Sequence, residues 1–277
     1  MIRILVDSAS DILKNNSDHI AVVPLSVNIN NHVYLDGVDL GHDQFYKMLE
    51  EVEEFPKTSQ PSPQSFVEEF EKVKEAGDEL ICIMLSSSIS GTYQSAVLAK
   101  SIVDYDKIYI VDSLSAIYGV KILVEEAKKC IEQGLAVQEI IDRLEILKSR
   151  IQIFLSVDTL EYLYKGGRLD RTSTIIGGIA KVKPIIELNR EGKINVVSKA
   201  IGMVRAMNSI IDLVNNKGID TNYPFYTLYS SGTKNIEKLE AKLVSNNISF
   251  NDRDEIGPVI GTHVGPEAFG VVFVTKE

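Results

Sequence analysis

The sequence predicts a two-domain α/β protein, with a parallel sheet in an N-terminal domain (residues 1–150) and a mixed or antiparallel sheet in a C-terminal domain (residues 151–277). Three observations lead to this prediction. Apolar, strand-like runs alternate with helical patterns between residues 78 and 133, which is the rhythm of a parallel sheet. Two strand-like runs flank the turn at residues 189–193, as in a hairpin. A length of 277 residues suffices for two moderate domains.

The first elements predict a strand, a capped helix start and a hairpin. Residues 2–6 form a short β-rich run that ends in an acidic and hydroxyl cluster at residues 7–11, a helix-start pattern. Residues 21–29 and 32–34 flank an Asn-Asn turn and predict a hairpin. Pro24 places the first strand of this pair at an edge or marks a break in it.

Helices and strands alternate through the rest of the N-terminal domain. A loop of defined shape at residues 57–63 separates the first two helices, and Pro63 suits the first turn of the second one. The expected helices cover residues 42–52, 64–76, about 92–103 and 136–150, and a further long helix follows the turn after Val111 and ends at about residue 133. The expected strands cover residues 80–85 and 107–111.

Hydroxyl-rich turns follow three of these strands, after Val6, Leu85 and Val111. Ligands of open α/β sheets bind at such strand ends, so the three turns predict one shared crevice. In the turn at residues 86–95, a helix start with unpaired N–H groups and serine donors would bind an anion. The alternative is that these serines only cap the helix.

The C-terminal domain is expected to carry a sheet with helices on one face. A strand at residues 151–157 and a short helix lead to Gly166-Gly167-Arg168. The remaining expected elements are helices at 171–182, 203–217 and 234–246, strands at 183–188, 194–197, 224–229 and 248–250, and a last segment at 262–274.

Composition and charge exclude several classes of function. With 29 Lys and Arg against 39 Asp and Glu, the net charge is −10, which argues against nucleic acid as the main partner. No run has the length of a membrane span, and the apolar run at residues 1–7 is too short for a signal peptide, so we expect a cytoplasmic protein without stable membrane insertion. Cys82 and Cys130 lie in apolar runs, and the four histidines lack zinc spacing, so neither metal nor cofactor is expected.

Several motifs together resemble one known family, although none of them is diagnostic alone. They are Val6-Asp7-Ser8-Ala9-Ser10-Asp11, Thr58-Ser59-Gln60-Pro61-Ser62, Leu85 to Ala96, Val111-Asp112-Ser113, Gly166-Gly167-Arg168 and His263-Val264-Gly265-Pro266. In this order, and over essentially the whole chain, they resemble the DegV family of bacterial fatty-acid-binding proteins.

The resemblance implies a fold of two α/β domains with a long-chain fatty acid buried between them. It implies a non-catalytic lipid carrier whose partner kinase phosphorylates the acid to an acyl-phosphate for phospholipid synthesis. By position, the carboxylate contacts fall on Thr58 and Ser90, while Arg168 and His263 lie near the head group and matter for coupling to the kinase.

The surroundings of the ligand follow from the same reasoning. Ser59, Gly91 and Ser113 are candidates for the pocket wall. We expect the apolar faces of the helices after Pro63 and after Ser90 to line the tunnel for the acyl tail.

One residue departs from the family pattern, and two other functions stay open. Glu267 stands where the family often has glycine, and it either disfavours an approaching anion or faces solvent. A binder of a small phosphorylated metabolite is the first alternative, although the chain lacks a Walker loop. A serine esterase using Ser90 and His263 is the second, although the chain lacks a G-x-S-x-G motif.

Overall fold

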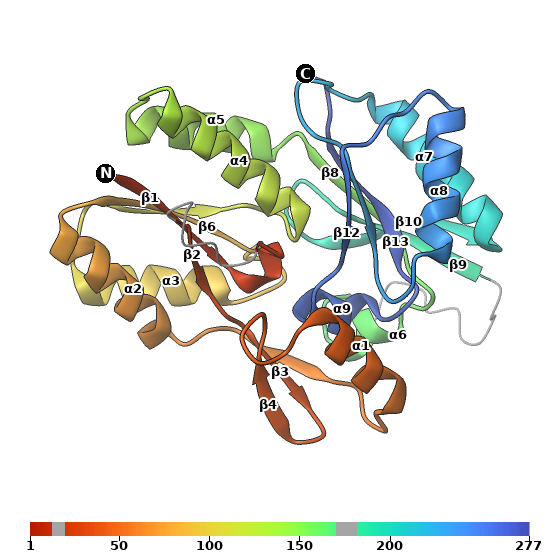
Figure 1. The fold of residues 1–277 in the computed structure, drawn as a ribbon, viewed down its shortest axis with the longest axis horizontal. Helices are drawn as coiled ribbons and strands as arrows, with labels where there is room; N and C mark the ends of the chain where they lie inside the picture. The colour runs from red at the N-terminus through yellow and green to blue at the C-terminus, as the bar shows by residue number, and fades with distance from the viewer. Residues whose placement is uncertain (13–19, 170–181, 277) are drawn as a thin grey trace.

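The computed structural model describes residues 1–12, 20–169 and 182–276, and contains three sheets in this part of the chain (Figure 1). A parallel sheet is followed by a larger mixed sheet, which confirms the predicted α/β class. The third sheet is small and was not predicted as a separate unit. The expected helix at 171–182 lies almost wholly outside the described residues.

The first sheet has the strand order β2-β1-β6-β7, with all neighbours parallel. Its strands are β1 (Ile2–Asp7), β2 (Ile20–Val23), β6 (Glu79–Met84) and β7 (Ile108–Asp112). Its helices are α2 (Pro63–Ala76), α3 (Thr92–Val103), α4 (Tyr118–Glu132) and α5 (Val137–Lys148). Alternate side chains divide between two cores: Cys82 packs with α2 and α3, whereas Ile81 and Ile83 pack with α4.

The second sheet has the order β10-β9-β8-β13-β11-β12 and is antiparallel except for β11 and β12. Its strands are β8 (Ile151–Ser156), β9 (Val182–Leu188), β10 (Ile194–Ile201), β11 (Tyr226–Tyr229), β12 (Asp252–Glu255) and β13 (Phe269–Val274). Helices α7 (Met203–Lys217) and α8 (Lys234–Ser245) cover one face through a separate core. The other face shares its core with α4, so the large sheets enclose a common apolar region.

The third sheet, of order β4-β3-β5, is antiparallel and joins a hairpin to the segment before α2. It contains β3 (Ser26–Ile29), β4 (His32–Leu35) and β5 (Lys57–Ser59), and α1 (His42–Glu51) follows the hairpin. Asn30 and Asn31 form the turn with positive φ angles of 50° and 62°, a backbone region that asparagine tolerates. Pro24 marks a break, since β2 ends before it and joins the parallel sheet instead.

Four local predictions need correction. The helix expected after Asp7 is one short 3₁₀ turn, η1 (Ser8–Ser10). The loop expected at 57–63 begins with strand β5, because its backbone pairs with β3. The strand expected at 248–250 starts four residues later, as β12. The last segment begins in helix α9 (Pro258–Val264) before β13, and α6 (Glu161–Lys165) is the remaining helix in the described residues.

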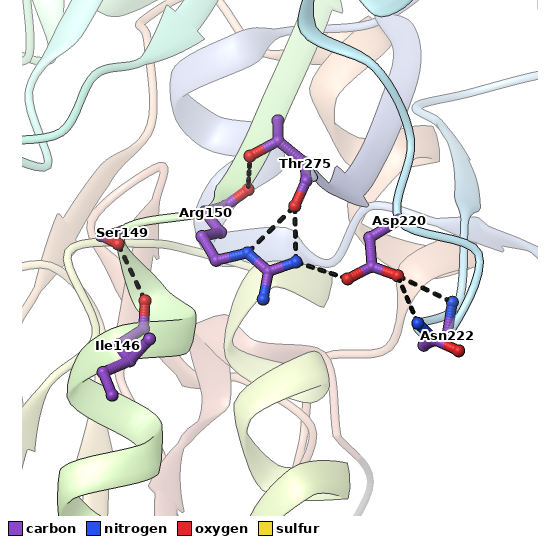
Figure 2. Close-up of polar contacts among 6 residues, drawn as sticks. All are labelled: Ile146, Ser149, Arg150, Asp220, Asn222 and Thr275. Carbon is purple, nitrogen blue, oxygen red and sulfur yellow. Dashed lines mark hydrogen bonds and ion pairs between the residues drawn. The ribbon is translucent and has the colours of Figure 1, made fainter. Parts of the chain in front are cut away.

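Arg150 fixes the start of the second sheet to the end of the chain (Figure 2). Its Nε and Nη2 atoms donate to the carbonyl of Thr275 at 3.0 and 2.7 Å, and Nη2 also pairs with Asp220. Charge-assisted bonds of this kind are stronger than neutral ones. No helix in the described part of the chain is long and apolar enough to cross a membrane.

Candidate functional site

The carboxyl ends of three parallel strands meet at one edge of the first sheet, as their turns predict. The carboxylate of Asp7, at the end of β1, accepts the N–H of Leu85 at 2.7 Å, and that of Asp112 accepts the N–H of Ser87 at 3.1 Å. Burial raises the pKa of Asp7 to about 6, while N–H groups of Leu85 and Ala9 oppose the rise. These two carboxylates therefore hold the turn that follows β6 rather than a ligand.

A cavity opens beside this turn, between the two large sheets. The centre of a water-sized sphere can occupy about 50 Å³ of it, and the space between atoms around this volume, open solvent included, is about 640 Å³. Thr58, Ser90, Arg168 and His263 all line it, so the four polar residues that the motifs single out, far apart in the sequence, share one site.

Thr58 and His263 form a hydrogen-bonded pair in the cavity wall. Thr58 comes from β5 and His263 from α9, and Thr58 Oγ1 lies 2.8 Å from His263 Nε2. The Nδ1 atom of His263 is buried and has no hydrogen-bond partner among the described residues. Burial, with a smaller contribution from the neighbouring Arg168, lowers the pKa of His263 to about 3, so its imidazole is neutral at pH 7.

Arg168 joins the two halves of the site. Its Nε donates to the carbonyl of Ile89 at 3.0 Å, and its Nη1 donates to the carbonyl of Gly166 at 2.6 Å. Burial lowers the pKa of its guanidinium, which nevertheless stays charged at pH 7. The side chain thus holds the serine-rich turn of the first half against the glycine pair of the second.

Ser90 lies just before the first turn of α3. Its Oγ is 2.8 Å from Thr92 Oγ1 and accepts the N–H of Thr92 at 3.3 Å. The N-cap residue of α3 is Gly91, so Ser90 binds the N–H of Thr92 from one position before the cap while it also lines the cavity.

The apolar wall of the cavity comes mostly from the second half of the chain, which corrects our expectation for the tunnel. It is built from Leu25, Leu85, Ile89, Ala116, Ile117, Ile153, Leu155, Leu163, Ile186, Leu188, Ile194, Val259, Ile260 and Val264, together with Glu187. The helices expected to line it turn their apolar faces elsewhere, because Phe66 of α2 and Ala96 of α3 belong to the core on the far side of the parallel sheet.

The three candidates for the pocket wall lie outside this lining. Ser59 is exposed, and Ser113 is buried with its hydroxyl donating to the carbonyl of Ser115 at 3.1 Å. Gly91 leaves room for Gln60, because an added Cβ would lie 1.9 Å from Gln60 Oε1. Gln60 Nε2 in turn donates to Ser95 Oγ in α3 at 2.9 Å. The sequence did not predict this supporting contact, although Gln60 belongs to the motif that begins with Thr58.

Glycine is needed at Gly166 because the His263 ring occupies the space beside it. A Cβ at Gly166 would lie 2.2 Å from His263 Nδ1, well inside contact distance. Glu267, the residue that departs from the family pattern, faces solvent and adopts a left-handed backbone with φ of 60°. Within residues 1–12, 20–169 and 182–276, no three His, Cys, Asp or Glu side chains are grouped to hold a metal ion.

Comparison with known proteins decides the family. The DegV family model matches residues 1–276. The chain belongs to the DegV family. A DegV domain-containing protein from Caldanaerobacter subterraneus subsp. tengcongensis is 40% identical over 279 residues, covering 99% of each chain.

Solved structures of other proteins share the fold. A fatty-acid-binding DegV protein from Thermus thermophilus matches with a TM-score of 0.89 at 28% identity, covering 99% of each chain. A stearic-acid-binding protein from Eubacterium ventriosum matches with a TM-score of 0.87 at 28% identity, covering all of this chain and 99% of the other.

Proposed function

We propose that this DegV-family protein binds a long-chain fatty acid in the cavity between its large sheets and presents the carboxylate to a partner kinase. The observation that carries the proposal is the cavity itself, which combines a long aliphatic wall with four polar residues. Relatives of the same fold are described as binding fatty acids.

The aliphatic wall would supply most of the affinity. Burying each methylene contributes about 0.8 kcal/mol, so a tail of about 14 methylenes contributes roughly 11 kcal/mol before the cost of association. Each hydrogen bond to the charged carboxylate contributes about 1.5–3 kcal/mol. The polar residues therefore mainly decide which end of the ligand faces outward.

Thr58 and Ser90 are the proposed carboxylate ligands. If the Thr58 hydroxyl donates its proton to the carboxylate, His263 Nε2 must carry the hydrogen that the Thr58 oxygen accepts across their 2.8 Å contact. Neutral His263 would thus orient Thr58 without forming an ion pair that would hold the carboxylate against phosphoryl transfer. Arg168 would add positive charge at the mouth, where an acyl-phosphate develops further negative charge.

The two alternatives have weaker support from this geometry. An esterase would need a base hydrogen-bonded to Ser90, whereas the His263 Nε2 atom pairs with Thr58 and no described residue orients Nδ1. A phosphorylated metabolite would leave the long aliphatic wall without a matching group.

Mass spectrometry of an organic extract of the purified protein tests the binding proposal. We expect one fatty acid per chain from the wild type and little from the double variant T58A/S90A. The variant S59A is the matched control, because Ser59 is exposed beside Thr58 and should retain its lipid. Full lipid recovery from the double variant would refute the assignment, and a phosphorylated metabolite in the extract would favour the first alternative.

The kinase step needs a separate test. Lipid-loaded protein, ATP and the purified fatty acid kinase subunit of the same organism should yield acyl-phosphate, trapped with hydroxylamine as a hydroxamate. Arg168→Ala should lower this yield at equal lipid loading. Unchanged turnover in that variant would remove Arg168 from the proposed role.

A further inference from the structure

The small sheet of β4, β3 and β5 has two faces, and only one of them belongs to the fatty acid site. Residues paired across antiparallel strands project to the same face. Tyr34, Val27 and Thr58 form one such row. Val27 is fully buried and Thr58 lines the cavity, so this row defines the inner face of the sheet.

The outer face carries apolar side chains that are exposed. Val33 shares a row with Asn28 and Lys57, and Leu35 shares the next row with Ser26 and Ser59. Val33 is 57% exposed, Leu35 40%, and Val38, in the turn after β4, 68%. In Figure 1 the β3–β4 hairpin projects from the lower side of the molecule.

Strand β4 is short, and Asp39 Oδ1 accepts the N–H of Leu35, but the strand itself carries no charged side chain that would repel a partner from this edge. It lies at the edge of the strand order, and its sequence, His-Val-Tyr-Leu, contains no Lys, Arg, Asp, Glu or proline. Natural edge strands commonly carry such residues because they prevent pairing with other chains. An exposed apolar patch of this kind is typical of an interaction surface.

An acidic hollow continues this surface. It is lined by Glu51, Glu53 and Glu54 from the end of α1 and the loop after it, and by Asn28 and Lys57 from the outer row that contains Val33. Three carboxylates against one ammonium give the hollow negative charge, in a chain whose net charge is −10. A complementary partner has basic side chains beside an apolar centre.

We propose that this outer face (Val33 and Leu35), the exposed turn residue Val38 and the acidic hollow (Glu51, Glu53 and Glu54) form the docking surface for the kinase that acts on the bound acid. The proposal rests on the proposed function. Position favours this partner, because Lys57 of the outer face and Thr58 of the inner face are consecutive residues of β5. Their side chains point to opposite faces, so only this single small sheet separates a protein seated on the outer face from the proposed carboxylate site. A second copy of the chain is disfavoured, since it would bring the same negative charge.

Steady-state kinetics with lipid-loaded protein as the varied substrate test the proposal, using the purified fatty acid kinase subunit of the same organism and ATP. Val33→Lys should raise the KM for the loaded protein about tenfold with little change in kcat. The matched control is Val244→Lys, because Val244 is 61% exposed on α8, in the other half of the chain, and should leave KM unchanged.

A charge-reversal pair tests the hollow independently of the sheet. The double variant E53K/E54K should raise KM and remove most of its dependence on NaCl concentration, whereas Glu75→Lys on α2, also at an exposed glutamate, should do neither. Mass spectrometry must show equal lipid loading in all variants.

Each outcome decides between the two proposals. Kinetics of V33K and E53K/E54K that match the wild type would overturn the docking surface while leaving the proposed function intact. A wild type that retains lipid but supports no turnover would overturn the kinase step, and the docking surface with it. Light scattering that shows a wild-type dimer and a V33K monomer would assign the face to self-association instead.

Discussion

Replacing Gly192 with alanine should break one defined contact between the two halves of the molecule. Gly192 lies in the turn between β9 and β10, with φ of +72°. Its carbonyl accepts a hydrogen bond from Ser86 Oγ at 2.9 Å, and the neighbouring Glu191 carbonyl accepts one from Ser88 Oγ at 2.6 Å. A Cβ at Gly192 would lie 2.1 Å from Ser86 Oγ and 3.0 Å from the backbone Cα of Leu114.

The cost of this substitution follows from two contributions. A left-handed backbone costs alanine about 1–2 kcal/mol, and the lower entropy of the unfolded alanine chain offsets about 0.4–1 kcal/mol of that. Displacing the turn also leaves the buried Ser86 hydroxyl without its acceptor, which costs about 1–3 kcal/mol. We therefore expect a loss of about 3 kcal/mol in the free energy of unfolding.

Gly134→Ala is the control that isolates the contact. Gly134 has nearly the same backbone, with φ of +74°, but nothing lies within 4 Å of an added Cβ. Urea unfolding should show a loss of about 1 kcal/mol there, since only the backbone contribution remains. The variant G192A should also release bound fatty acid faster, because Leu188 and Ile194 beside the turn line the cavity. Equal losses in the two variants would refute the importance of the contact between Gly192 and Ser86.

Three further predictions concern the site and the buried ionisable groups. Gly166→Ala should displace His263 and lower lipid recovery. Gly167→Ala should only destabilise the fold, because a Cβ added there meets no described residue beyond its chain neighbours within 4 Å. Equal lipid content in both variants would contradict the steric argument. Burial raises the pKa of Asp36 to about 7. The protonated Asp36 carboxyl therefore contributes fully to the free energy of unfolding below about pH 4, where the unfolded carboxyl is also protonated, and this contribution is lost as the pH rises to about 7. Asp36→Asn should therefore flatten the decline in unfolding free energy between these pH values, and an unchanged slope would exclude Asp36 as its source. Cys82 is fully buried with a raised thiol pKa and should react with iodoacetamide only after unfolding, so rapid labelling of the native protein would show that the first sheet opens.

The polar half of the site could be predicted because its signals are local. An acidic or hydroxyl residue directly after an apolar run marks a strand end, and parallel strands bring such ends to one edge. Asp7, Leu85 and Asp112 meet there as expected. The positions of Thr58, Ser90, Arg168 and His263 in one cavity follow from the motif resemblance rather than from spacing, since their sequence separations carry no geometric signal.

The apolar half could not be predicted, because a buried strand has aliphatic residues on both faces. Ile185 and Ile186 are consecutive in β9 and are both buried. Ile185 packs in the core with α7 and α8, whereas Ile186 lines the cavity. Isoleucine thus occurs in both environments, and only the pairing of β9 with its neighbours decides which isoleucine faces the core and which faces the cavity.

In the serine-rich turn, part of the motif makes long-range contacts that the local sequence does not predict. The local sequence predicts caps or pocket wall for these serines, but Ser86 and Ser88 donate to carbonyls of the β9–β10 turn, more than 100 residues away in the sequence. Arg168 makes the reverse contact, from the second half of the chain to the carbonyl of Ile89. The groups proposed to surround the carboxylate therefore also join the two halves, so bound fatty acid should stabilise the whole fold in proportion to the logarithm of its free concentration.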